Sequence, residues 1–231
     1  MRFRYGASFA MLVAVASACS QGGSVSLESN DAKASYAIGQ DVGRNLKPAE
    51  SHLDLDAFVK GLEDMLADAE SAVSPEELQA ALQQFSQEVT EEQEAQRAVQ
   101  SETNLAEGEA YLAENGAREG VTTTPTGLQY EILREGEGAM PTDDDRVSIH
   151  YRGTLTDGTE FDSSYGRGEP ATFGVGGVIP GFTEALKLLN VGGQIRVVIP
   201  GDLAYGPAGS GEVIGPNATL IFEIELLEIV E

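Results

Sequence analysis

The sequence predicts an α+β protein with an all-helical N-terminal half, a long connecting helix and a C-terminal domain built on an antiparallel sheet. Three observations support this order. Residues 31–115 place apolar side chains at helical spacing and show no strand-like alternation. Residues 116–126 contain glycine, threonine and proline, which are typical of a linker. Residues 127–231 contain apolar segments with the alternation of strands.

Length and composition limit the possible functions. A chain of 231 residues leaves room for one large domain or two small ones and a targeting segment. Acidic residues outnumber basic ones 38 to 14, and the formal charge of -24 argues against nucleic acid as a partner, because it repels phosphate. The single cysteine excludes an intramolecular disulfide. With only His52 and His150 beside it, we expect no metal and no cofactor, and both histidines at the surface.

Residues 1–18 are typical of a signal peptide, because arginines at positions 2 and 4 precede an apolar stretch too short to span a bilayer. The stretch ends in V-A-S-A-C, which resembles a bacterial lipoprotein signal and predicts a lipid on Cys19. The alternative is ordinary cleavage after Ala18, which leaves Cys19 as a spare thiol. In both cases we expect export to the periplasm, and a lipid would anchor the protein at the outer membrane. Residues 19–30 are polar and predict a flexible tether.

Two helices are expected in the first part of the mature chain. The first spans 32–46, where Ile38 and Val42 lie on one face. The second spans 54–69, where Phe58 and Leu62 begin an apolar stripe.

The third helix has the clearest start signal. Ser74 is the expected N-cap, Pro75 fills the first helical position and Glu77 completes a capping box. No stop signal follows before residues 115–116, so a continuous helix would have about 40 residues and a length of about 60 Å. The alternative is a break into two helices near Gly108.

The C-terminal half predicts strands over 128–133, 146–153, 195–199 and 219–229. Asp157 and Gly158 predict a tight hairpin turn. Residues 182–189 are expected to form the only helical stretch. A strongly twisted antiparallel sheet wrapped on one short helix fits this order.

Four ordered motifs carry a family resemblance: F-D-S at 161–163, V-I-P-G at 178–181, A-Y-G at 204–206 and A-T-L-I-F-E-I-E-L at 218–226. The region 127–231 resembles the FKBP-type peptidyl-prolyl isomerases. The segment K-A-S-Y-A-I-G-Q-D-V-G-R-N-L at 33–46 and the later G-L-Q-Y resemble the exported Mip and FkpA group. In that group, the region corresponding to 31–115 is a dimerisation module with a connecting helix. A homodimer is also expected because three helices with few large apolar residues form a thin core.

Prolyl isomerisation requires an apolar pocket, because the twisted amide of the transition state has less charge separation than the planar amide. The resemblance implies that the substrate is bound by six residues, with Phe182 as the floor: Tyr151, Phe161, Phe173, Val178, Ile179 and Phe182. It assigns catalysis to Asp162, Tyr205 and Phe222. Without the resemblance, Asp162 is as readily explained as the cap of a turn.

The resemblance gives each polar group a role. Asp162, held by Tyr151 and Arg167, is expected beside the twisting amide, and Tyr205 is expected to donate its hydroxyl to the substrate carbonyl. The backbone N–H of Ile179 would donate to the substrate peptide. Three positions depart from the small cytosolic members and are expected to rim the pocket: Ala171, Leu203 and Ser210.

The expected function is peptidyl-prolyl cis-trans isomerisation of proline-containing unfolded or partly folded polypeptides, assisting the folding of exported proteins, with added chaperone activity. The alternative is a holdase that grips such clients without significant catalysis. A weaker third reading is a surface factor that acts on host proteins.

Overall fold

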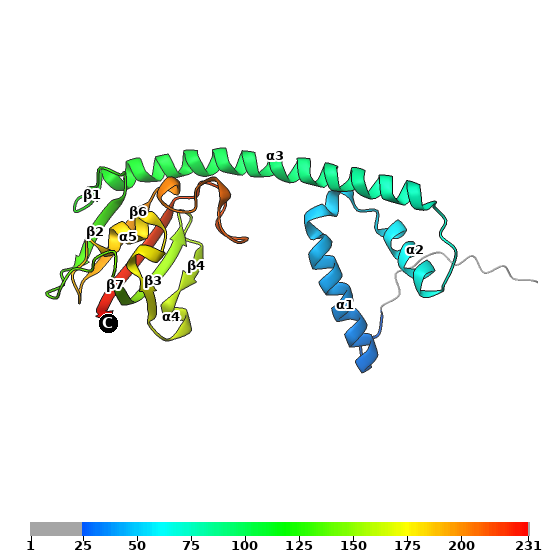
Figure 1. The fold of residues 1–231 in the computed structure, drawn as a ribbon, viewed down its shortest axis with the longest axis horizontal. Coiled ribbons are helices and arrows are strands. Elements are labelled where there is room, and N and C mark those ends of the chain that lie inside the picture. The colour runs from blue at the N-terminus through cyan, green and yellow to red at the C-terminus, as the bar shows by residue number, and fades with distance from the viewer. Residues whose placement is uncertain (1–24, 231) are drawn as a thin grey trace, which may run out of the picture. The chain divides into compact units, whose positions relative to one another are not determined.

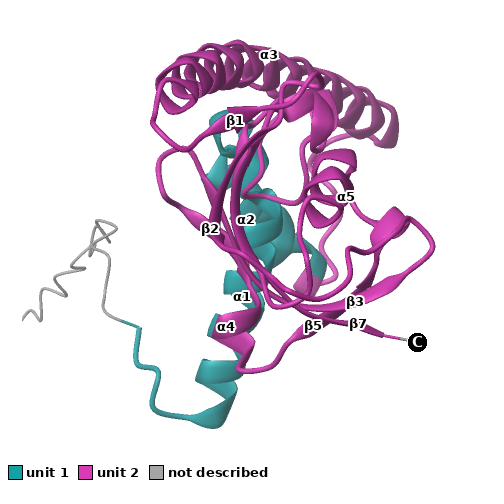
Figure 2. Ribbon diagram, turned by 90° about the vertical axis from the view of Figure 1, so that its left-hand side faces the viewer, with its two compact units in different colours: residues 1–65 teal, residues 66–231 magenta. Residues whose placement is uncertain are grey.

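A computed structural model describes residues 25–230, and the predicted signal peptide and Cys19 lie outside the described residues. The chain divides into two compact units, 1–65 and 66–231, which Figure 2 shows in different colours. The first unit is helical, and the second contains the longest helix and the sheet.

The helices of the first unit are α1 (Asn30–Leu46), η1 (Lys47–His52) and α2 (Leu55–Leu66). The N-cap of α1 is Ser29, whose Oγ accepts the N–H of Ala32 at 3.1 Å. The predicted helices over 32–46 and 54–69 are confirmed, with ends that differ by up to three residues. The 3-10 turn η1 is a further element, and Pro48 near its start explains why α1 ends there.

The apolar faces of α1 and α2 are exposed. No residue of either helix is buried, and Ile38 is 65% exposed. Leu62 is 52% exposed, although leucine is usually buried. Within the described residues, these faces therefore lack a partner that covers them.

The longest element is α3 (Pro75–Gly116), a continuous helix of 42 residues (Figure 1). It starts with the predicted capping box, in which Ser74 and Glu77 each accept the other's backbone N–H. The alternative of a break near Gly108 is wrong. Gly108 lies instead where α3 touches the second unit's sheet region, because a Cβ atom there would lie 2.3 Å from Oγ1 of Thr219.

The second unit contains a seven-stranded antiparallel sheet in the order β1-β2-β6-β7-β3-β4, with β5 paired to β3. Its strands are β1 (Thr122–Thr123), β2 (Gln129–Arg134), β3 (Arg146–Leu155), β4 (Glu160–Ser163), β5 (Ala171–Gly174), β6 (Gln194–Ile199) and β7 (Leu220–Val230). The hairpin between β3 and β4 turns at the predicted place, since Gly158 has φ 88° and donates its N–H to Leu155 at 3.0 Å.

The core lies between the sheet and α5 (Pro180–Leu186), and Figure 2 shows α5 on the inner side of the curved sheet. Phe182 and Leu186 of α5 belong to one buried cluster with Ile149 of β3 and Leu220 of β7. The expected fold class is confirmed. The expectation of a single helical stretch is wrong, because α4 (Ser164–Arg167) adds a second short helix.

Three strands are missing from the sequence-based prediction. β4 and β5 have four residues each and β1 has two, too few for alternation to show. β4 and β5 exist through backbone pairing with β3, such as Asp162 with Gly153 across the hairpin and Phe173 with Val147. β1 lies inside the segment expected to be a linker.

A buried amide fixes the last turns of α3 to the sheet. Asn115 is 4% exposed, and its Nδ2 donates to Oε1 of Gln129 at 2.9 Å. Gln129 returns a bond from its Nε2 to the carbonyl of Leu112 at 2.8 Å. Arg196 donates to Oδ1 of Asn115 at 3.1 Å and to the hydroxyl of Tyr111 at 2.7 Å. Because these buried groups are paired, this end of α3 is a rigid extension of the sheet.

Candidate active site

The second unit contains a cavity of about 700 Å³, a volume typical of a ligand site. The structure brings all the predicted catalytic and substrate-binding residues into its lining: Tyr151, Phe161, Asp162, Phe173, Val178, Ile179, Phe182, Tyr205 and Phe222. They come from β3, β4, β5, the start of α5, the loop after β6, and β7. One site thus collects residues that are up to 71 positions apart in the chain.

The cavity wall is a cluster of aromatic rings in edge-to-face contact. The ring centroids of Phe182 and Phe222 lie 5.0 Å apart with an interplanar angle of 84°. Phe161 meets Phe222 at 5.5 Å and 83°, and Tyr151 meets Phe173 at 5.7 Å and 65°. These distances are in the favourable range for aromatic pairs. The rings therefore form a continuous, packed apolar wall.

A glycine lets the aromatic cluster form. A Cβ atom at Gly153 would lie 2.6 Å from the ring of Phe161 and 2.8 Å from that of Phe222. Only glycine leaves room for both rings against β3 at this position.

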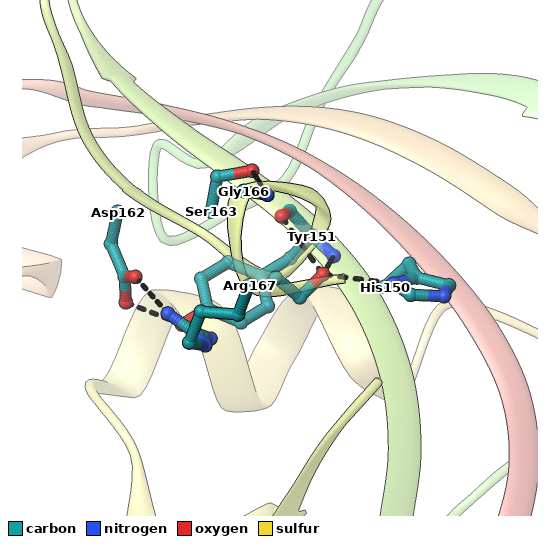
Figure 3. Close-up of polar contacts among 7 residues, drawn as sticks. His150, Tyr151, Asp162, Ser163, Gly166 and Arg167 are labelled. Atoms are coloured by element: carbon teal, nitrogen blue, oxygen red, sulfur yellow. Dashed lines mark hydrogen bonds and ion pairs between the residues drawn. The ribbon is translucent and has the colours of Figure 1, made fainter. Parts of the chain in front are cut away.

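Asp162 is held at the cavity by two donors (Figure 3). Its Oδ2 accepts a short hydrogen bond from the Tyr151 hydroxyl, and its Oδ1 accepts Nη1 of Arg167 at 2.6 Å. Nη2 of Arg167 also donates to the Tyr151 hydroxyl at 2.9 Å. The predicted contacts of Asp162 are present. The turn after Phe161 is capped instead by Ser163, whose Oγ accepts the N–H of Gly166 at 3.4 Å.

These contacts set the charge of Asp162. Burial raises the pKa of its carboxyl, but hydrogen bonds from Tyr151 and Arg167, with the charge of Arg167, outweigh this and leave the pKa below its ordinary value. Burial, and next the bond to Asp162, raise the pKa of the Tyr151 hydroxyl. At neutral pH the site therefore contains an ionised carboxylate and a protonated tyrosine.

The position of Tyr151 is also set through its backbone. The buried hydroxyl of Ser164 accepts the N–H of Tyr151 at 2.8 Å and donates to its carbonyl at 3.2 Å. His150 contacts the same hydroxyl at 3.0 Å and stacks on Tyr165 with centroids 4.7 Å apart. His150 is half-buried in this network rather than a free surface residue. Sequence reasoning missed it because α4, which supplies Ser164 and Tyr165, has only four residues.

The two residues that carry the remaining predicted polar groups, Tyr205 and Ile179, line the cavity as expected. Tyr205 is 40% exposed and lines the cavity. Ile179 is the residue before α5, and its carbonyl accepts the N–H groups of Phe182 and Thr183. Ile179 is thus the N-cap of α5, and its own N–H lies before the first helical residue, Pro180.

Most of one side of the cavity was not foreseen. The segment 210–214 contributes five consecutive lining residues, of which only Ser210 was expected; the other four are Gly211, Glu212, Val213 and Ile214. Its only sequence signal is the pair of glycines, Gly209 and Gly211, between A-Y-G and V-I-G-P. Of the three departures, Ser210 lines the cavity as expected. Ala171 and Leu203 do not line the cavity, and both are partly buried against the core cluster.

The part of the chain that the structure describes contains no cluster of His, Cys, Asp or Glu that could hold a metal ion. Over the same residues, no helix is long and apolar enough to cross a membrane.

Comparisons with known proteins match both halves of the chain. The family model "FKBP-type peptidyl-prolyl cis-trans isomerase" matches residues 137–227, and the model "Domain amino terminal to FKBP-type peptidyl-prolyl isomerase" matches residues 31–132. The FKBP-type 22 kDa peptidyl-prolyl cis-trans isomerase of Escherichia coli is 47% identical over 202 residues, covering 86% of this chain and 95% of that protein.

Two other relatives match over most of their length. The outer membrane protein MIP of Legionella longbeachae is 40% identical over 219 residues, covering 95% of this chain and 94% of its own. The crystal structure of FkpA from Escherichia coli matches with a TM-score of 0.67 and 42% identity, covering 87% of this chain and 97% of that one.

Proposed function

The chain belongs to the FKBP-type peptidyl-prolyl cis-trans isomerases, and we propose that the aromatic cavity of residues 127–231 is its active site. The observation that carries this proposal is the combination of a packed apolar wall with one ionised carboxylate at the same cavity. Tyr151 belongs to both, because its ring packs in the wall and its hydroxyl binds Asp162.

The reaction rotates the amide before proline and makes or breaks no covalent bond. Its barrier of about 20 kcal/mol comes from lost conjugation across the C–N bond. The twisted amide is less charge-separated than the planar amide and loses less when water is removed. A cavity walled by Phe182 and Phe222 therefore binds the twisted form more tightly than the planar form, which is what catalysis requires.

The polar groups give the substrate its orientation. The carboxylate of Asp162 lies beside the twisting amide and polarises it. The hydroxyl of Tyr205 donates to the substrate carbonyl, and the N–H of Ile179 donates to the peptide and sets its register. Exchange spectroscopy on a short apolar–Pro peptide tests this function. A rate with enzyme equal to the uncatalysed rate would favour the holdase instead.

The exposed apolar faces support a homodimer formed through residues 31–89. The exposed residues on these faces are Ile38, Val42, Phe58, Leu62, Leu66, Leu78 and Leu82. Burial against a second copy stabilises the assembly by about 25 cal/mol for each Å² of apolar surface. The 42-residue helix α3 and the acidic N-terminal half support an added chaperone activity toward unfolded, proline-containing clients.

Export and a lipid anchor on Cys19 are part of the proposal. Support comes from the sequence of residues 1–18 and from a relative that is named an outer membrane protein. The placement that follows is the periplasm, at the outer membrane.

A further inference from the structure

The glycine-rich segment 206–217, here called the pocket loop, closes one side of the cavity. Its tip is held by a backbone pair, in which Ser210 and Ile214 donate to each other's carbonyls at 2.8 and 3.2 Å. Its two ends are joined where the N–H of Asn217 donates to the carbonyl of Gly206 at 2.7 Å. These bonds define the loop's internal shape but do not fix it on the domain.

The connecting helix fixes the loop at three points. Nη2 of Arg97 donates to the carbonyl of Ala208 at 3.0 Å, and Nδ2 of Asn104 donates to the carbonyl of Pro216 at 2.7 Å. Between them, Nδ2 of Asn217 donates to Oγ of Ser101 at 2.7 Å. The three α3 residues are spaced by four and three positions and thus share one face of the helix.

The loop backbone lies directly on α3 (Figure 1). A Cβ atom at Gly215 would lie 2.8 Å from both Nδ2 of Asn104 and Nε2 of Gln100. The helix is itself anchored further along, at Gly108 against Thr219 and through the buried Asn115. The support beneath the loop is therefore rigid.

We propose that Arg97, Ser101 and Asn104 of the connecting helix are positioning residues that preorganise the pocket loop and so set the affinity of the cavity for its peptide. A glycine-rich loop without these anchors would lose conformational entropy on binding substrate. The anchors lie on α3, outside the cavity lining, so their loss should weaken binding and leave the rotation step nearly unchanged. The inference rests on the proposed function, because it takes the cavity as the substrate site.

The test uses the full mature chain with Asn104→Asp and Ser101→Ala, alone and combined. Aspartate is isosteric with asparagine but has no N–H to offer the Pro216 carbonyl. Each single variant should raise KM about fivefold with kcat nearly unchanged, the effect of one net hydrogen bond. Ser101→Thr, which keeps the hydroxyl acceptor, should restore the wild-type KM. Thr103→Ala is the matched control, since Thr103 is exposed and bonds only within the helix, to the carbonyl of Val99.

Amide spectra of residues 210–214 in the free variants supply a second readout. The variants should shift these amides, while Thr103→Ala should not. Unmoved amides, or moved amides with an unchanged KM, would overturn the inference. Asp162→Ala separates the two proposals: if that variant keeps wild-type exchange, the proposed active site fails whatever the loop does.

Discussion

Arg167 and Asp162 form an ion pair in which Nη1 and Oδ1 lie 2.6 Å apart, and the same guanidinium reaches the Tyr151 hydroxyl. The pair joins α4 to β4. The Tyr151 hydroxyl, the Arg167 guanidinium and the Asp162 carboxylate are each hydrogen-bonded to the other two. This arrangement fixes the direction of the carboxylate and keeps it ionised.

Arg167→Ala should lower kcat/KM about fivefold, because a partly exposed ion pair contributes about 1 kcal/mol to holding its partner. The loss should be smaller than that from removing Asp162. Exchange rates measured at several peptide concentrations check this. Arg152→Ala is the control, since Arg152 makes a similar ion pair with Glu160 at 2.7 Å but lies outside the cavity lining. An equal loss in both variants would contradict a specific role for Arg167.

The catalysed rate should be independent of pH through the neutral range and fall only in acid. Burial raises the pKa of the Asp162 carboxyl, but the hydrogen bonds from Tyr151 and Arg167 and the charge of Arg167 outweigh it and hold the pKa below its ordinary value. A depressed pKa means that the ion pair contributes stability above the ordinary aspartate value, about 3.9, and that this contribution is lost as pH falls through the folded-state pKa. Exchange measured across pH should show this acid limb in the wild type and lose it in Asp162→Asn. A fall in the catalysed rate near neutral pH would count against a lowered pKa of Asp162 in the active site.

Most of the helical half and the long strands could be predicted from sequence because their signals are local. The capping box of Ser74 and Glu77 marks the start of α3 without any tertiary information. The site residues came from motifs that resemble a family.

What could not be predicted depends on long-range contacts. β5 is a strand because it pairs with β3, and the pocket loop contacts α3 residues that lie 111 and 112 positions away in the chain. Ala171 and Leu203 were expected at the rim, yet neither lines the cavity, and both pack against the core cluster. Local sequence patterns do not show which residues far apart in the chain contact one another.

The role of Cys19 can be tested in cells. If Cys19 carries a lipid, Cys19→Ser should release the protein from the membrane fraction, since a lipid chain contributes about 0.8 kcal/mol for each buried CH₂ group. Fractionation of cells that express each form measures this. Unchanged membrane association in the serine variant would rule out the anchor.

The full mature chain should be a dimer at micromolar concentration, and a fragment that begins at Gly120 should be monomeric. The fragment retains every cavity residue and should still isomerise small peptides, with a raised KM because it lacks the loop supports on α3. It should also lose suppression of client aggregation. Sedimentation of both proteins decides the first point. A monomeric full-length chain would refute the dimer.

The central claim is that the aromatic cavity catalyses the rotation, and cis–trans exchange in an apolar–Pro peptide tests it most directly. Wild-type protein should accelerate exchange well above the uncatalysed rate. Asp162→Ala and Phe222→Ala should each lower the catalysed rate by about tenfold or more, equivalent to about 1.4 kcal/mol, with circular dichroism showing that each variant folds. Asp143→Ala, which breaks only an exposed ion pair with Lys187, should match the wild type. Folded Asp162→Ala and Phe222→Ala variants with undiminished exchange would contradict the claim.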